Sequence, residues 1–185
     1  MSENKAVETK KEPGMAQLVI ILFAISAITA LLLGLVNMLT APAIAANAEK
    51  KNNLAMAAVL PADSYTLVEY TGDDANIIAI NKAGDAGYVV QVECPGSFNG
   101  GLQAMVGVAN DGTVTGVEIV KTGETSGLGA NAGKPVFKDQ FVGQGDGLSV
   151  TKDGGSIAPI TGATITSRAV CAGVNSAVAA AASMG

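Results

Sequence analysis

The chain has no histidine and no tryptophan among its 185 residues, and only two cysteines, Cys94 and Cys171. Without histidine it lacks the commonest metal ligand and the commonest general base. Two cysteines are too few to hold an iron–sulfur cluster within one chain. They either form one disulfide outside the cytoplasm or remain two buried thiols. The composition argues against a self-contained hydrolase or metalloenzyme, so we expect no metal site and no catalytic residue.

Positive charge is also scarce. The chain has 11 Lys and Arg against 16 Asp and Glu, a formal net charge of −5, and its basic residues are scattered. A nucleic-acid surface needs clustered positive charge. We therefore expect no nucleic-acid partner.

A long uncharged stretch stands near the N-terminus. No charged residue occurs from Pro13 to Ala48, and Met15 to Val36 is nearly all apolar. A hydrocarbon core about 30 Å thick needs roughly 20 helical residues to cross it. A cleavable signal peptide is the alternative, because small residues recur from Thr40 to Ala48, but its apolar region is usually only about 7–15 residues long. The pattern predicts a transmembrane helix over residues 15–39.

The lysines around this stretch predict its orientation. Lys5, Lys10 and Lys11 precede it closely, whereas Lys50 and Lys51 follow at a distance. This bias favours a cytoplasmic N-terminus in the inner membrane. We expect a cytoplasmic tail over residues 1–14, a linker and short helix over residues 40–61, and an extracytoplasmic domain over residues 62–185.

Beyond Pro61 the apolar pattern changes from helical to alternating, which is typical of strands. Short turns separate the segments, and the Asp-Gly of Asn110–Thr113 is a strong hairpin signal. Short connections predict a meandering antiparallel sheet. The expected strands are residues 64–70, 76–80, 87–93, 102–109 and 114–120.

The last third of the chain has a different residue pattern. It begins glycine-rich, then becomes weakly helical around Phe137 and Phe141, and residues 147–151 could add a final strand. A helix then runs to the C-terminus, with an apolar stripe of Cys171, Val174, Val178 and Ala181. The expected fold class is α+β, with one N-terminal transmembrane helix followed by a twisted antiparallel sheet and flanking helices.

The segment Ile-Thr-Gly-Ala-Thr-Ile-Thr-Ser, residues 160–167, places small and hydroxylated residues where the last helix begins. Hydroxyls at this place commonly cap a helix. The free amides and the positive end of the helix dipole would also favour a phosphate. Arg168 could add a cation if it faces the same way. Physical reasoning alone leaves capping and anion binding both open.

Two motifs resemble one family. Thr161 to Thr164 reads Thr-Gly-Ala-Thr, and Glu124 to Gly129 reads Glu-Thr-Ser-Gly-Leu-Gly. With the single anchor and the sheet, they resemble the RnfG/RsxG–NqrC family, the FMN-carrying subunits of the Rnf complex and of the Na⁺-translocating NADH:quinone oxidoreductase. The resemblance covers essentially the whole chain. The sequence departs from the family pattern at Ser126, where proline is usual, and at Ala158, where an acidic residue is common.

The resemblance implies that FMN is attached covalently, through a phosphoester with the Thr164 hydroxyl. We expect Leu128 to pack on the flavin ring. For Glu124, the only acid of its loop, a solvated carboxylate is the simplest interpretation, with flavin tuning or cation binding as alternatives. The cofactor-binding residues implied are Thr164, Thr161, Gly162, Ala163, Ile165, Thr166 and Ser167, with Glu124, Thr125, Ser126, Gly127, Leu128 and Gly129.

The resemblance also implies partners and a function. A threonine hydroxyl is a poor nucleophile near neutral pH, so we expect a separate flavin transferase of the ApbE type. The leading hypothesis is an electron-transfer subunit of an Rnf-type complex, coupling electron flow between ferredoxin and NAD⁺ to Na⁺ or H⁺ translocation, without independent catalysis. The alternatives are an anchored FMN domain serving another extracytoplasmic reductase, the NqrC subunit, and a scaffold whose threonines only cap a helix. Rnf is favoured over the quinone reductase because the chain is short.

Overall fold

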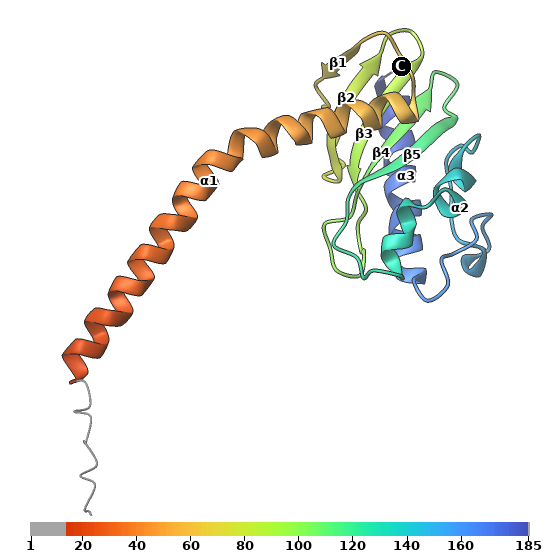
Figure 1. Cartoon of the computed structure of the whole chain (residues 1–185). Helices are drawn as coiled ribbons and strands as arrows, with labels where there is room; N and C mark the ends of the chain where they lie inside the picture. Colours follow the sequence, from red (N-terminus) through yellow and green to blue (C-terminus); the bar gives the residue numbers. More distant parts are fainter. Residues whose placement is uncertain (1–13, 185) are drawn as a thin grey trace, which may run out of the picture. The chain divides into compact units, whose positions relative to one another are not determined.

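The computed structural model describes residues 14–184. Residues 1–13, which include the three N-terminal lysines of the orientation argument, lie outside the described residues. The chain divides at Ala48 into two compact units, and each is described by itself. Helix α1, Met15–Val59, begins in the first unit and ends in the second (Figure 1).

In the first unit, α1 is exposed along its whole described length. It is the one helix of residues 14–184 that is long and apolar enough to cross a membrane. Exposed apolar side chains on this scale need a partner other than water, and lipid meets that need. The structure thus supports a single-pass anchor.

The structure corrects the linker predicted over residues 40–61. Residues 40–59 continue α1, and the helix includes Pro42. This stretch is rich in alanine, which has the highest helix propensity. A single proline removes only one backbone hydrogen bond within a long helix. The helix ends at Val59, two residues before Pro61. Proline disfavours the helical conformation in the residue that precedes it, which explains this end point.

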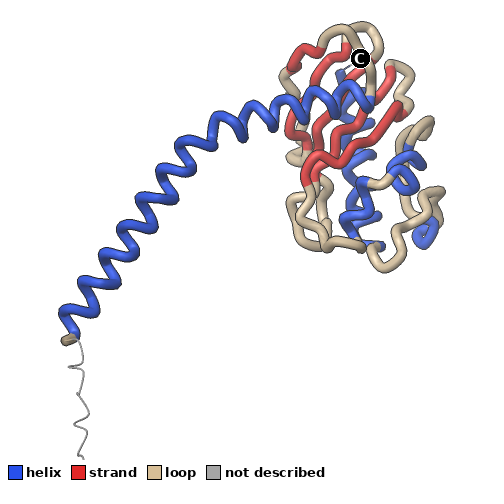
Figure 2. Tube along the Cα trace, in the orientation of Figure 1, coloured by secondary structure: helices blue, strands red, loops and turns tan. Residues whose placement is uncertain are grey.

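The second unit is built on one antiparallel sheet of order β1-β2-β3-β4-β5 (Figures 1 and 2). The predicted meander and fold class are therefore confirmed. The β4–β5 hairpin turns at the predicted Asp-Gly, with Gly112 at φ +83°. The strands are β1 Tyr65–Val68, β2 Ile77–Ala83, β3 Gly87–Glu93, β4 Gln103–Ala109 and β5 Val114–Lys121.

Helix α3, Thr164–Met184, packs on one face of the sheet and forms the main core with it. The predicted stripe of Cys171, Val174, Val178 and Ala181 lies in this core. Even-numbered residues of β3 and β4, such as Val90 and Val106, point to it because side chains alternate across a strand.

The end of α1 packs on the opposite face, where Met56 and Val59 meet Val89 and Met105. Two facing glycines allow this close approach: a Cβ on Gly107 would lie 2.5 Å from the Val59 carbonyl oxygen, and one on Gly116 would lie 2.9 Å from the Val59 Cα. The sheet is buried on both faces, which explains why β4 is apolar at nearly every position.

Short elements connect β5 to α3. They are η1 Gly129–Gly133, α2 Pro135–Lys138, η2 Asp139–Phe141 and η3 Thr151–Asp153. The predicted weak helix corresponds to α2 and η2, where the Phe137 and Phe141 rings pack edge to face at 5.4 Å. The strand predicted over residues 147–151 is wrong. Only Val150 forms an isolated bridge, with Ile157, because the chain folds back on itself there.

Cys94 and Cys171 are both free thiols and both buried. Burial raises the pKa of Cys94 to about 12 and that of Cys171 to about 11. Of the two alternatives from sequence, the structure therefore has two buried thiols, which behave as small apolar side chains.

Candidate functional site

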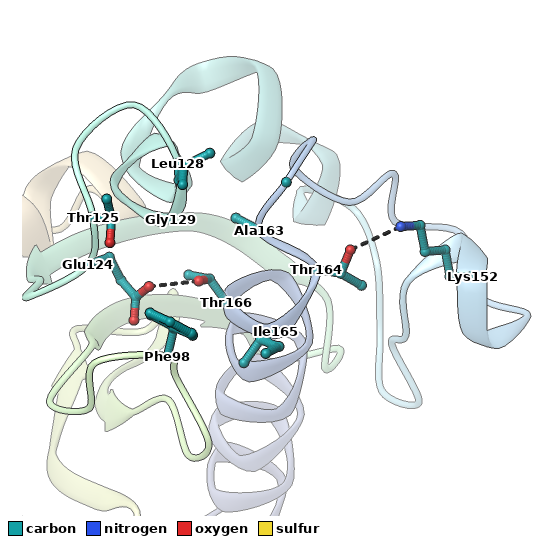
Figure 3. Close-up of a pocket in the computed structure, with 11 residues that line it drawn as sticks. Phe98, Glu124, Thr125, Leu128, Gly129, Lys152, Ala163, Thr164, Ile165 and Thr166 are labelled. Carbon is teal, nitrogen blue, oxygen red and sulfur yellow. Dashed lines mark hydrogen bonds between the residues drawn. The ribbon is translucent and has the colours of Figure 1, made fainter.

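The two sequence motifs meet at one cavity of about 340 Å³, at the start of α3 (Figure 3). Its volume lies at the lower end of the range of about 300–1,000 Å³ that is usual for small-molecule sites. It is lined by Phe98, Glu124, Thr125, Leu128, Gly129, Lys152, Gly162, Ala163, Thr164, Ile165 and Thr166.

The chain enters α3 through a tight turn. The Ala163 amide donates to the Ile160 carbonyl oxygen at 3.0 Å, and Gly162 has φ +76°, a conformation that favours glycine. Ser167 holds this turn from inside the helix, because its hydroxyl accepts from the Ile160 amide at 2.9 Å and donates to the Ala163 carbonyl oxygen at 2.9 Å.

The first helical hydrogen bond of α3 runs from the Ser167 amide to the Ala163 carbonyl oxygen. Ala163 is therefore the N-cap, and it has no side-chain acceptor. Within residues 14–184, no protein group accepts a hydrogen bond from the amides of Thr164, Ile165 and Thr166. The threonines of the motif do not cap the helix, and its first amides remain available to an anion.

Glu124 joins three segments of the site. Its side chain is only 8% exposed, so the expectation of a solvated carboxylate is wrong. Oε2 accepts from the Thr166 hydroxyl at 2.8 Å, and Oε1 accepts from the Asn99 amide at 3.2 Å. A buried carboxylate needs such partners. Glu124 thus ties its own loop to α3 and to the loop that carries Phe98.

Glycine at position 129 is required by this contact. A Cβ on Gly129 would lie 2.3 Å from Glu124 Oε2 and 2.7 Å from Thr166 Oγ1. Both atoms are buried and hydrogen-bonded to each other, so neither can move away cheaply. The Leu-Gly of the second motif therefore lets the loop close over the Glu124–Thr166 pair.

Three apolar side chains stand at the cavity with much of their surface in solvent. Phe98 is 66% exposed, Ile165 is 49% exposed and Leu128 is 44% exposed. They come from three different segments, which Figure 3 shows around the cavity. A flat aromatic ligand could cover apolar surface of this kind.

The cation of the cavity is Lys152 and not Arg168. Lys152 Nζ donates to Thr164 Oγ1 at 3.1 Å (Figure 3). Arg168 turns away to Asp153, with Nε–Oδ2 and Nη2–Oδ1 distances of 2.6 Å. Hydrogen bonding to Arg168 holds the pKa of Asp153 below its ordinary value. The suggestion that Arg168 adds a cation to the site is corrected accordingly.

Of the thirteen cofactor-binding residues implied by sequence, nine line this cavity. Thr161 and Gly127 line a neighbouring cavity of about 650 Å³. Ser126 is exposed and lines neither cavity, and Ser167 is buried beneath the turn. Sequence reasoning missed Phe98, in the loop between β3 and β4, and Lys152, in η3, because both lie outside the two motifs.

Comparison with known proteins identifies the family of this chain. Residues 97–179 match the FMN-binding domain family. The G subunit of the Na⁺-translocating ferredoxin:NAD⁺ oxidoreductase complex of Acetobacterium woodii is 36% identical, over 86% of this chain and 87% of the relative. The chain belongs to the RnfG family of ion-translocating oxidoreductase complexes. The G subunit of the ion-translocating oxidoreductase complex of Methanosarcina acetivorans is 33% identical over 89% of this chain and 93% of its own length.

A third relative is the G subunit of the proton-translocating ferredoxin:NAD⁺ oxidoreductase complex of Clostridium ljungdahlii. It is 46% identical over 49% of this chain and 51% of its own length. All eleven residues that line the cavity fall within the FMN-binding domain match. The family resemblance read from the two motifs is confirmed, and the chain carries an FMN-binding domain over residues 97–179.

Proposed function

We propose that this RnfG-family chain carries FMN covalently, through a phosphoester with the Thr164 hydroxyl, and relays electrons within an Rnf-type complex. That complex would couple electron flow between ferredoxin and NAD⁺ to movement of Na⁺ or H⁺. The observation that carries the proposal is the position of Thr164. Its side chain lines the cavity at the first residue of α3, beside the Lys152 ammonium and three amides that have no acceptor within residues 14–184.

The residues present fit the two ends of FMN. The amides of Thr164, Ile165 and Thr166, together with the positive end of the helix dipole, suit its phosphate. The exposed side chains of Phe98 and Leu128 suit its apolar ring. Gly162 and Ala163, between these two parts, carry no side chain larger than a methyl group.

When bound, the flavin supplies the redox chemistry. The protein binds and orients it. Glu124 fixes the loop that carries Leu128 and, through the Asn99 amide, the loop that carries Phe98.

A covalent bond suits a flavin on the outer face of a membrane. A flavin held without it would be diluted whenever it dissociated, whereas an ester prevents that loss. Attachment requires a transferase of the ApbE type, with FAD as the donor and a divalent metal belonging to that enzyme. The Thr164 hydroxyl is a poor nucleophile by itself, and the chain has no histidine to activate it.

The anchor has a limited role in this proposal. Helix α1 would cross the inner membrane once, with the FMN domain on the extracytoplasmic face. A single span without a charged residue from Pro13 to Ala48 provides no ion pathway. Ion translocation would therefore occur in partner subunits.

The attachment is tested on denaturing gels. The full-length chain, made in cells with an active flavin transferase, should give a band with flavin fluorescence. Thr164→Val should give none, because it removes the accepting oxygen and keeps the side-chain shape. Thr161→Val is the matched control and should keep the fluorescence. Equal fluorescence in Thr164→Val would overturn the proposed attachment.

Membership in an Rnf-type complex is tested separately. Mild detergent extraction of the tagged full-length chain from its native membrane should recover multi-span and iron–sulfur partner subunits. Recovery of the flavin-bearing chain with a different extracytoplasmic reductase, and without those subunits, would favour the anchored FMN domain of another system. This outcome would leave the attachment at Thr164 intact.

A further inference from the structure

The segment over residues 149–157, which includes η3, belongs to neither motif, yet it supplies the cation of the cavity, Lys152. Backbone hydrogen bonds join the two ends of this segment. The Thr151 amide donates to the Ile157 carbonyl oxygen at 2.8 Å, and the Gly155 amide donates to the Val150 carbonyl oxygen at 3.1 Å. Gly154 turns the chain at φ +86°. A Cβ on Gly155 would lie 2.1 Å from the Ser149 carbonyl oxygen. The backbone of this segment, including that of Lys152, is therefore fixed by its own hydrogen bonds.

Lys152 is the one basic residue among those that line the cavity. Its Nζ donates to Thr164 Oγ1 at 3.1 Å, so the ammonium stands one hydrogen bond from the oxygen that would bear the phosphate. Since the ammonium donates to Oγ1, the hydroxyl proton of Thr164 is left free to point elsewhere.

The neighbouring acid, Asp153, forms its salt bridge with Arg168 and not with this ammonium. Both carboxylate oxygens of Asp153 accept hydrogen bonds from Arg168, at 2.6 Å each. This two-pronged geometry is the strong form of an arginine–carboxylate pair. With Asp153 held by Arg168, the positive charge of Lys152 remains available on the cavity side of the segment.

We propose that Lys152 is a positioning residue for the flavin phosphate, acting both while the ester forms and after it has formed. This inference rests on the proposed attachment at Thr164. During transfer, the bond between Thr164 Oγ1 and the FMN phosphorus forms, and the P–O–P bond of FAD breaks. AMP leaves, and the hydroxyl proton passes to a base of the transferase. Lys152 stabilises negative charge on the transferred phosphoryl group and then pairs with the phosphodiester anion.

The rate of attachment gives the test. Unmodified full-length chain in detergent is incubated with an ApbE-type transferase, FAD and Mg²⁺, and intact mass follows the adduct with time. Lys152→Gln should slow the initial rate about 10- to 100-fold, the loss expected for one charge-assisted hydrogen bond. Lys152→Arg should return the rate to within about threefold of wild type. Lys134→Gln, a change at a lysine of the neighbouring cavity, should have no effect.

A second measurement does not depend on the rate. Once modified material has been collected, the ³¹P resonance of the phosphodiester should shift between wild type and Lys152→Gln, and should return toward the wild-type position in Lys152→Arg. Protection of the buried Cys94 and Cys171 thiols from alkylation verifies that each variant is folded.

The outcomes separate the two proposals. If wild type gains no adduct at Thr164, the proposed attachment fails and this inference fails with it. If wild type is modified and Lys152→Gln is modified equally fast with an unchanged ³¹P resonance, only the role of Lys152 is overturned. Equal slowing in Lys152→Gln and Lys152→Arg would also overturn it, because charge would then not be the property that matters.

Discussion

Replacing Thr166 by valine tests the hydrogen bond that holds the site together. The Thr166 side chain is 1% exposed and its hydroxyl donates to Glu124 Oε2 at 2.8 Å. Valine has nearly the same shape, so the main change is the loss of the donor. A hydrogen bond to a charged group contributes about 1.5–3 kcal/mol, and an unpaired buried carboxylate oxygen adds a desolvation cost. We expect Thr166→Val to lower the free energy of unfolding by about 2–3 kcal/mol.

The assay is thermal unfolding of the full-length, unmodified chain in detergent, followed by a thiol-reactive dye that reports exposure of Cys94 and Cys171. For domains of about 150 residues, 1 kcal/mol corresponds to about 2–4 °C in melting temperature. Thr166→Val should therefore melt about 4–12 °C below wild type. Thr161→Val, at an exposed hydroxyl of the same motif, should melt within about 1 °C of it.

A double-mutant cycle with Glu124→Gln assigns the loss to the pair. The glutamine can still accept hydrogen bonds but carries no charge, so Thr166→Val should cost less in that background. An equal melting temperature for Thr166→Val and wild type would refute the predicted role of this hydrogen bond. That role is also refuted if the effect of Thr166→Val is the same with and without the Glu124 charge, because the hydroxyl would then not act through the carboxylate.

Three further predictions follow from other parts of the domain. Gly107→Ala should destabilise the chain by about 1–3 kcal/mol, because its Cβ would lie 2.5 Å from a carbonyl oxygen of α1, whereas Gly123→Ala, with its nearest contact at 3.6 Å, should be tolerated. Asp153 has a lowered pKa in the folded chain, so its contribution to stability is present above its unfolded pKa of about 3.9 and is lost as pH falls through the folded pKa. The melting-temperature difference between wild type and Asp153→Asn should therefore be constant from about pH 7 to 5, shrink as pH falls below about 4, and vanish only below the folded pKa. Cys94 and Cys171, with pKa values raised to about 12 and about 11, should resist iodoacetamide at pH 8 in the native chain and react on unfolding.

A specific result would contradict each of these three predictions. Equal melting temperatures for the two glycine variants would contradict the close packing of α1 on the sheet. A difference for Asp153→Asn that stays the same as pH falls from 5 to 2 would contradict its linkage to ionisation of the carboxylate. Rapid alkylation of either cysteine in the native chain would contradict its burial.

The sequence predicted the sheet well because local signals define it. Strand β3 was expected over residues 87–93 and is found there, since its apolar run is bounded by turns. The β4–β5 hairpin followed from a two-residue Asp-Gly signal. By contrast, the strand expected over residues 147–151 depends on a long-range partner, and the chain instead forms one bridge between Val150 and Ile157.

The site was predictable only in part. The two motifs identify the residues around Thr164 and Leu128 because the family pattern is local in sequence. Phe98 and Lys152 could not be found in this way, since the hydrogen bonds that bring their segments to the cavity, Asn99 to Glu124 and Lys152 to Thr164, are tertiary contacts. The burial of Glu124 is likewise a tertiary property, set by Thr166 forty-two positions away along the chain.

The central claim is attachment of FMN to one oxygen of Thr164. Trypsin cleaves after Lys152 and Arg168 and releases residues 153–168 as one peptide. In denatured protein from its native membrane, this peptide should be heavier by one FMN less one water, and fragmentation should place the added mass on Thr164. An unmodified peptide, or an adduct on Thr161 or Thr166, would contradict the account.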